Sequence, residues 1–475
     1  MADYTHVIPT TVNNLKAAAR FRPIEFINWA KLVKPLRQSS TREGASFDLY
    51  ALAFHLFTRL PFDYSPAAAR PDLSPPRPPH RTDLDQLQVG LFADAPEHLS
   101  GVATTLGHWN RMAKSRNQSF KLHSAGDQPV IPDGVCFPRM GSFRLHAYDG
   151  LTLHMPRVDE VLDYIAASRF DVLHISTPGP MGMIALLAAK TLQLPVVSTF
   201  HTHFPSYVQR LTGDDELTQA TWSFMRWFYN QMHAVAAPTP SVRDELITQG
   251  VDPARIHIVG RGVDRQRFSP RFRDEGLRLS WGPHHLTRLV YVGRLSKEKN
   301  LDCLVDAFLH CLTTRPELQL ILVGDGPYRP ELEARLEGTN AVFAGTRKGE
   351  DLARHYASGD LFVFPSQTDT LGNVVLEAQA SGLPVVVSSH GGPKDCMQDG
   401  VTGLVIPDLN ASTLAENILE LTRHPETLDR MGAAARTHSR RYSHEAAFDA
   451  FWALHPTAQT VAMEQARNAP SAMAT

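Results

Sequence analysis

Two carboxylic residues bracket a glycine turn in the last third of the chain. Asp369 and Glu377 stand eight positions apart, and the turn between them begins at Thr370. Eight positions are a little over two turns of an α-helix, which has about 3.6 residues per turn. The first amides of a helix lack partners inside it and therefore favour oxygen-rich anions. The spacing predicts a ligand site built from two carboxylates and a helix N-terminus.

Two cations and two histidines stand where other strands are expected to end. Arg294 and Lys299 follow Gly293, and fixed positive charge of this kind can bind phosphate. Taken alone, two solvated loop cations are the more common interpretation. His201 and His203 follow an apolar run, and we expect them to act at the ligand-facing edge of a sheet. Without a third ligand they make an incomplete metal site, so we expect no metal.

Strands and helices alternate around these residues. Residues 360–364 are a short apolar run typical of a buried parallel strand, residues 374–380 predict a helix, and residues 383–387 predict the next strand. The same succession begins near residue 84. Repeats of this kind indicate parallel sheets, which bind ligands outside the carboxyl ends of their strands. The sequence therefore predicts an α/β protein with two Rossmann-like, doubly wound domains facing a cleft.

The length of 475 residues is too great for one core and predicts two or three domains. Prolines crowd residues 65–80, which predicts a linker because proline disrupts both helices and central strands. We expect an N-terminal extension with this linker at 1–83, an N-terminal domain at 84–272, a C-terminal domain at 273–430 and a helical tail at 431–475.

Composition excludes several classes of protein. The net charge is −2 and no long basic block occurs, so we expect no nucleic-acid partner. The four cysteines are scattered, which suits a reducing compartment. The N-terminus lacks the pattern of a secretory signal, and no apolar run approaches the length of a spanning helix. We expect a cytoplasmic protein, with peripheral contact at the inner membrane face left open.

Aromatic residues recur at helical spacing between residues 218 and 232. Such a stripe is usually part of a core. A face that touches a membrane or an acceptor is the less common alternative.

Several motifs occur together in one order, and this ordered set resembles a known family. They are the loop at Gly101, Phe200-His-Thr, Gly260-Arg-Gly-Val-Asp, Val292-Gly-Arg-Leu-Ser-Lys-Glu-Lys-Asn, Val323-Gly-Asp-Gly-Pro and the stretch from Asp369 to Glu377. Between residues 88 and 442 the chain resembles the retaining glycosyltransferases of the GT-B fold, group 1 (family 4). That class includes mannosyltransferases and sulfoquinovosyltransferases.

The resemblance implies roles for individual residues. It implies an acceptor-binding N-terminal domain and a donor-binding C-terminal domain. The implied catalytic residues are His201, Asp369, Arg294 and Lys299. The implied donor-binding residues are Gly101, Gly293, Arg294, Lys299, Gly345, Arg347, Leu371, Gly372, Asn373 and Glu377. His203 is a weaker candidate for contact with the acceptor. The family commonly has glutamate where this chain has Asp369, but some members have aspartate there, and we expect activity.

The implied reaction moves a hexose from a UDP- or GDP-sugar to a glycan or lipid acceptor. It retains the anomeric configuration and needs neither a metal nor another cofactor. Two alternatives stay open from the sequence: a non-catalytic scaffold that binds nucleotide-sugars, and a GT-B epimerase or phosphorylase. No lysine in the chain has the setting expected of a pyridoxal phosphate site, which disfavours the phosphorylase.

Overall fold

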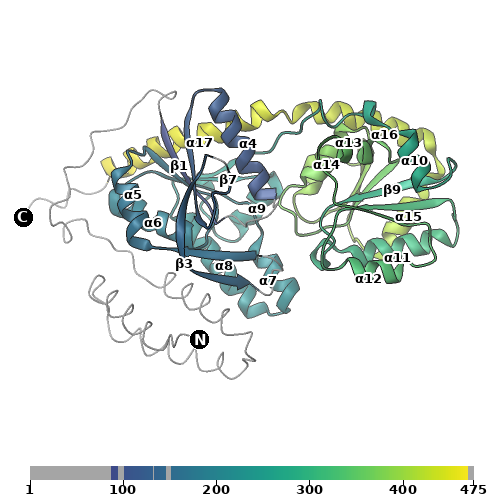
Figure 1. Cartoon of the computed structure of the whole chain (residues 1–475), viewed down its shortest axis with the longest axis horizontal. Coiled ribbons are helices and arrows are strands. Elements are labelled where there is room, and N and C mark those ends of the chain that lie inside the picture. The colour runs from purple at the N-terminus through teal and green to yellow at the C-terminus, as the bar shows by residue number, and fades with distance from the viewer. Residues whose placement is uncertain (1–86, 95–100, 132, 146–150, 469–475) are drawn as a thin grey trace, which may run out of the picture. The chain divides into compact units, whose positions relative to one another are not determined.

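The structure is a computed structural model that describes residues 87–94, 101–131, 133–145 and 151–468 (Figure 1). The predicted extension and linker, residues 1–83, lie outside the described residues. The predicted α/β fold is confirmed, because the described residues form two largely parallel sheets with helices packed against them.

The first sheet has the strand order β4-β3-β2-β1-β5-β6-β7-β8 within the described residues. Its strands are β1 (Gln88–Phe92), β2 (Ser119–Gly126), β3 (Val135–Leu145), β4 (Leu151–Pro156), β5 (Val172–Ile175), β6 (Val196–Thr199), β7 (Ala234–Ala237) and β8 (Ile256–Ile258). Strands β5, β6 and β7 are buried along their whole length. Continuous apolar runs are typical of parallel strands covered by helices on both faces.

The helices of this half connect successive strands. They are α4 (Gly101–Ser115), α5 (Val158–Ala167), α6 (Pro180–Leu192), α7 (Phe204–Thr212), α8 (Asp215–Asn230) and α9 (Pro240–Thr248), followed by the short 3-10 helix η4 (Pro253–Arg255). Helix α8 is the aromatic helix, and Trp222, Phe224, Phe228 and Tyr229 are all buried. Their burial confirms that this stripe belongs to the core.

The second sheet has the order β11-β10-β9-β12-β13-β14, and its neighbouring strands are all parallel. Its strands are β9 (Thr287–Val292), β10 (Leu318–Val323), β11 (Val342–Gly345), β12 (Leu361–Phe364), β13 (Val385–Ser388) and β14 (Gly403–Ile406). Its helices are α10 (Glu275–Trp281), α11 (Leu301–Leu312), α12 (Arg329–Arg335), α13 (Gly349–Ala357), α14 (Asn373–Ala380) and α15 (Ala411–Arg423). The described part of the chain after β8 also has the 3-10 helices η5 (Pro270–Phe272), η6 (Lys297–Lys299), η7 (Pro393–Cys396) and η8 (Ser439–Arg441).

Each sheet has one point at which its strand order reverses. In the first sheet, β1 lies between β2 and β5, and in the second sheet β9 lies between β10 and β12. Loops leave such a point in opposite directions and open a crevice outside the carboxyl ends of the two strands. We therefore expect ligand-binding groups in the loops after β1, β5, β9 and β12.

Of the two C-terminal helices, the last one returns to the first sheet. Helix α16 (Pro425–His438) packs against α14 and α15, whereas α17 (His444–Asn468) packs against α4 and strands β5, β6 and β7 (Figure 1). Phe448 and Phe451 of α17 are fully buried in the core that includes β1 and α4. The predicted tail at 431–475 thus includes a helix that completes the first domain's core.

A buried chain of hydrogen bonds through His455 and His174 joins α17 to the first sheet. His455 Nδ1 lies 3.0 Å from the Trp452 carbonyl, His455 Nε2 lies 3.1 Å from His174 Nδ1, and His174 Nε2 lies 2.9 Å from the Thr199 hydroxyl. A carbonyl only accepts, so Nδ1 of His455 carries its proton, Nδ1 of His174 donates to His455, and Thr199 donates to His174. Both rings are neutral in this arrangement.

Two linkers meet where the chain passes between its sheets. The amide of Val263 donates to the Tyr442 carbonyl at 2.9 Å. A Cβ atom at Gly262 would lie 2.4 Å from the backbone of His444, so only glycine fits at this crossing. No helix among the described residues is both long and apolar enough to cross a membrane.

Candidate active site

The loop after β9 is locked by the loop after β10. The amide of Leu295 donates to the Asp325 carbonyl at 3.0 Å. Gly324 faces this contact with φ of +145°, and a Cβ there would lie 1.9 Å from the Gly293 carbonyl oxygen. Gly324 therefore has a structural role, because no side chain fits at this contact. Arg294 lies between Gly293 and Leu295, so these contacts also hold its backbone at the end of β9.

Lys299 and Asp369 meet at the point where the second sheet reverses its order. Lys299 Nζ lies 2.9 Å from both carboxylate oxygens of Asp369, one residue following β9 and the other following β12. The Ser366 hydroxyl also donates to Asp369. Burial disfavours the charged form of Lys299, but the Asp369 carboxylate outweighs it and raises the lysine pKa. The site therefore holds a fixed ammonium group at the crevice.

Glu377 is a partly buried carboxylic acid on α14. The Tyr356 hydroxyl, from α13, donates to Glu377 Oε2 at 2.8 Å. Burial raises the pKa of Glu377 to about 7, although the Tyr356 hydrogen bond and the charge of Arg267 both lower it. Tyr356 was missed by sequence reasoning, because a tyrosine on another helix gives no local signal.

The turn before α14 forms as predicted. Gly372 is the N-cap of α14 with φ of +106°, and Asn373 is the first helical residue. Leu371 is buried, and the Oδ1 atom of Asn373 is buried without a partner among the described residues. The Thr370 hydroxyl donates to the His201 carbonyl oxygen at 3.0 Å, which joins this turn to the end of β6.

His201 is buried and held by an arginine that sequence reasoning quoted in a motif without giving it a role. Nη2 of Arg261 lies 3.1 Å from His201 Nδ1. A guanidinium only donates, so Nδ1 accepts and the ring proton sits on Nε2. Burial, and then Arg261, lower the His201 pKa well below its usual range, so the ring is neutral. Its buried Nε2–H has no partner among the described residues and is available to a ligand.

His203 is engaged on both sides of its ring. Nδ1 accepts from the Ser206 amide at 3.1 Å and caps α7, while Nε2 lies 2.8 Å from Glu245 Oε1. Neither ring nitrogen of His203 can bind the acceptor substrate without losing one of these two hydrogen bonds. The predicted acceptor contact stays a prediction, beside a clear structural role.

The remaining predicted donor residues lie at other strand ends. The Gly345 carbonyl at the end of β11 accepts from the Gly324 amide at 3.0 Å. Arg347 is exposed, and its guanidinium donates to the Ala344 carbonyl at 2.8 Å and to Asp351 at 3.2 Å. Gly101 is the first residue of α4, directly after residues 95–100, which lie outside the described residues.

Asp94 is a second residue that sequence reasoning missed. It follows β1, and its carboxylate accepts from the amide of Met181 at 2.8 Å and from the Thr177 hydroxyl at 3.0 Å. Burial raises the Asp94 pKa to about 6. This residue joins β1 to the start of α6 at the point where the first sheet reverses. An acidic residue directly after the first strand was the available signal.

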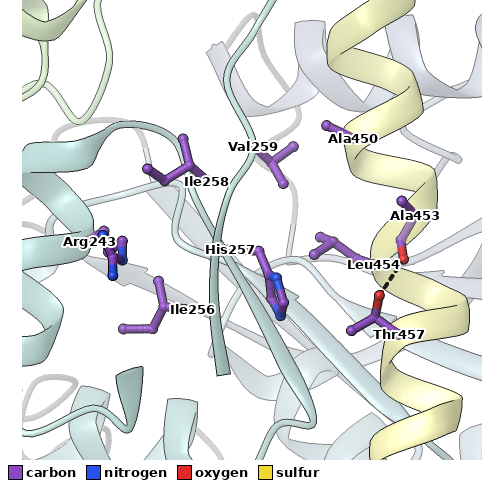
Figure 2. Close-up of a pocket in the computed structure, with 9 residues that line it drawn as sticks. All are labelled: Arg243, Ile256, His257, Ile258, Val259, Ala450, Ala453, Leu454 and Thr457. Atoms are coloured by element: carbon purple, nitrogen blue, oxygen red, sulfur yellow. Dashed lines mark hydrogen bonds between the residues drawn. The ribbon is translucent and has the colours of Figure 1, made fainter. Parts of the chain in front are cut away.

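A cavity of about 440 Å³ lies away from these residues, beside the edge strand β8 and helix α17 (Figure 2). Its lining residues are mostly apolar: Arg243, Ile256, His257, Ile258, Val259, Ala450, Ala453, Leu454 and Thr457. None of the predicted site residues is among them. Since β8 is the last strand of its sheet, this cavity is separate from the crevice at β1 and β5.

Comparison with known proteins decides the family. Residues 99–267 match a family model described as Glycosyltransferase Family 4, and residues 287–424 match one described as Glycosyl transferases group 1. A sulfoquinovosyl transferase of Arabidopsis thaliana is 36% identical over 352 residues, covering 70% of this chain and 68% of that protein. The chain belongs to the group 1, family 4 glycosyltransferases.

A second relative and a solved structure agree with this assignment. A GDP-mannose-dependent alpha-mannosyltransferase of Mycobacterium tuberculosis is 37% identical over 277 residues, covering 58% of this chain and 70% of that protein. Anabaena HepE, solved in complex with UDP and glucose, superimposes with a TM-score of 0.61 at 18% identity, over 80% of this chain and all of that one. That likeness confirms the GT-B fold.

Membership of the family makes this protein a hexosyltransferase that moves a sugar from a nucleotide-sugar to a lipid or glycan acceptor. It favours the transferase over the scaffold, epimerase and phosphorylase alternatives.

Proposed function

We propose that this glycosyltransferase moves a hexose from a UDP- or GDP-linked donor with retention of configuration and without a metal ion. The observation that carries the proposal is the contact between Lys299 and Asp369 at the reversal point between β9 and β12. It places a fixed cation where a doubly wound sheet binds the phosphates of a nucleotide. A fixed cation stabilises the charge of a leaving diphosphate, which is the task that a divalent ion performs in other enzymes.

Each part of the donor has a candidate partner in this site. Arg294 and Lys299 would bind the diphosphate, and Glu377 would accept hydrogen bonds from the ribose hydroxyls. The Nε2–H of His201 would donate to a hydroxyl of the transferred sugar, because this buried donor otherwise lacks a partner. Asp369 would lie beside the same sugar while holding Lys299 in place.

The proposed transfer needs little acid–base chemistry from the protein. The acceptor oxygen forms a bond to C1 of the sugar as the bond from C1 to the diphosphate oxygen breaks on the same face. The leaving phosphate oxygen takes the acceptor's proton. The side chains described above then contribute position and fixed charge, which are large terms in catalysis.

The two named relatives suggest different donor sugars, mannose and sulfoquinovose, and the donor panel should include both. Thermal stability of the wild-type protein would be measured with UDP-glucose, UDP-galactose, UDP-GlcNAc, UDP-sulfoquinovose and GDP-mannose. A donor at about one hundred times its dissociation constant adds roughly 2.7 kcal/mol of stability.

The matched variant for this panel is Glu377→Ala. We expect one donor to stabilise the wild type strongly and the variant weakly. If no donor stabilises the wild type, the proposed donor site is wrong. If the variant responds as strongly as the wild type, the role of Glu377 is wrong.

A further inference from the structure

Arg261 is half-buried and, unlike the fully or nearly fully buried Arg278 and Arg288, makes no hydrogen bond to an oxygen atom among the described residues. Arg278 pairs with Asp360 at 3.0 Å and donates to a carbonyl at 2.6 Å. Arg288 is fully buried and donates to four backbone carbonyl oxygens. By contrast, Arg261 makes one hydrogen bond within the described part of the chain, to a neutral histidine, and forms no ion pair there. A guanidinium has five N–H donors, so most of its binding capacity is unused.

The surroundings of Arg261 are poor in negative charge. Burial lowers the Arg261 pKa to about 10, and the neighbouring Cys396 thiol offers no compensating charge, because burial raises the pKa of that thiol to about 12. That thiol is itself buried against the Leu371 carbonyl. Removing a cation from water without an anion nearby is unfavourable, and a bound anion would offset that cost.

Arg261 also lies at the junction of the two domains. Its histidine partner, His201, follows β6 of the first sheet, and the His201 carbonyl accepts from Thr370 of the turn before α14. Cys396 belongs to η7 of the second domain. The guanidinium is therefore within reach of a substrate that touches both His201 and the α14 turn. The cations expected at the diphosphate, Arg294 and Lys299, belong to a different loop, the one after β9.

We propose that Arg261 binds an oxyanion of the substrate, a carboxylate, sulfonate or phosphate, beside His201. This inference rests on the proposed function, because it uses the same cleft. The planar fork of Arg261 can donate two parallel hydrogen bonds to such a group while Nη2 keeps its contact with His201. The anion has two possible sources: a substituent on the donor sugar, or the head group of the acceptor.

The first arm of the test concerns the donor. Dissociation constants would be measured by calorimetry for UDP, UDP-glucose and UDP-glucuronate, or for GDP, GDP-mannose and GDP-mannuronate if guanine is the base that binds. The proteins would be the wild type, Arg261→Gln, Arg261→Lys and the control Arg265→Gln, whose arginine is exposed on the same linker. If the sugar carries the anion, the wild type prefers the uronate by about tenfold or more, the effect of one charge-assisted hydrogen bond.

The second arm concerns the acceptor. Turnover of the preferred donor would be measured with diacylglycerol and with phosphatidylinositol in phosphatidylcholine vesicles. If the acceptor carries the anion, the wild type has the lower KM for phosphatidylinositol. In the supporting result of either arm, Arg261→Gln removes the preference for the anion, Arg261→Lys keeps part of it, and Arg265→Gln keeps all of it.

Three results would overturn the inference. In the first, the wild type prefers the neutral compound in both arms. In the second, Arg261→Gln leaves an anionic preference unchanged. In the third, Arg261→Gln weakens binding of the nucleotide diphosphate alone by the same factor as every other ligand, which would make Arg261 a further diphosphate group. Failure of all nucleotides to bind the wild type would instead reject the proposed function on which the inference stands.

Discussion

Protonation of Glu377 should control donor binding near neutral pH. Its pKa is raised to about 7 by burial, and the proposed ribose contact needs the carboxylate, because an ionised acceptor makes the stronger hydrogen bond. At that pKa the carboxylate is about 90% of the total at pH 8 and about 10% at pH 6. The dissociation constant of the donor should therefore rise about tenfold, or about 1.4 kcal/mol, from pH 8 to pH 6.

Calorimetry with a nucleotide-sugar measures this dependence cleanly, because its diphosphate is esterified at both ends and does not titrate in this window. Glu377→Gln should bind weakly at both pH values and lose the pH dependence. The Tyr356 hydroxyl donates to Glu377 and lowers the Glu377 pKa. Tyr356→Phe removes this hydrogen bond and should raise that pKa, so the fall in affinity should begin at a higher pH. A wild-type affinity that is constant from pH 6 to pH 8, or a slope that survives in Glu377→Gln, would refute the reasoning.

Three further predictions concern charge, backbone and the buried histidines. Lys299→Met leaves the Asp369 carboxylate unpaired beside the donor diphosphate and should weaken donor binding by about tenfold or more in calorimetry. The control Lys297→Met changes an exposed lysine and should leave donor binding unchanged. Equal effects of the two substitutions would contradict the assignment of Lys299 to the diphosphate. Gly324→Ala forces a Cβ to within 1.9 Å of a carbonyl oxygen and should lower the free energy of unfolding in urea by more than about 2 kcal/mol. The control Gly107→Ala, inside α4, should leave that free energy unchanged or raise it slightly. If Gly324→Ala leaves it unchanged too, the loop adapts to the extra atom. Burial lowers the His455 pKa to about 4, so the unfolded chain binds the proton first, and stability should fall by up to ~1.4 kcal/mol per pH unit as the pH drops from 6.5 towards 4. Unfolding of His455→Leu should depend less on pH over that range, and an unchanged slope would exclude His455 as the cause.

Much of the fold follows from local patterns. Short apolar runs such as residues 360–364 predicted buried strands, and the structure has β12 there, from Leu361 to Phe364. The predicted helix 374–380 begins one residue earlier, at Asn373. These predictions succeed because chain periodicity and glycine placement act over a few residues and need no distant partner.

The candidate residues were also found from their local setting, since polar residues directly after strands gather at one edge of a parallel sheet. Their partners could not be found in this way. Tyr356 beside Glu377, Arg261 beside His201 and the return of α17 to the first sheet all join residues far apart in the chain.

The sequence by itself determined the element types, the parallel sheets, the family and the positions at which chemistry is expected. The tertiary structure alone decided the strand order, and with it the two reversal points that bring Lys299 to Asp369. It also decided the charge states at the site. Burial raises the Glu377 pKa, and a donor-only guanidinium sets the tautomer of His201. The physical reason is that desolvation and hydrogen-bond partners depend on which distant groups pack together, and no local pattern encodes them.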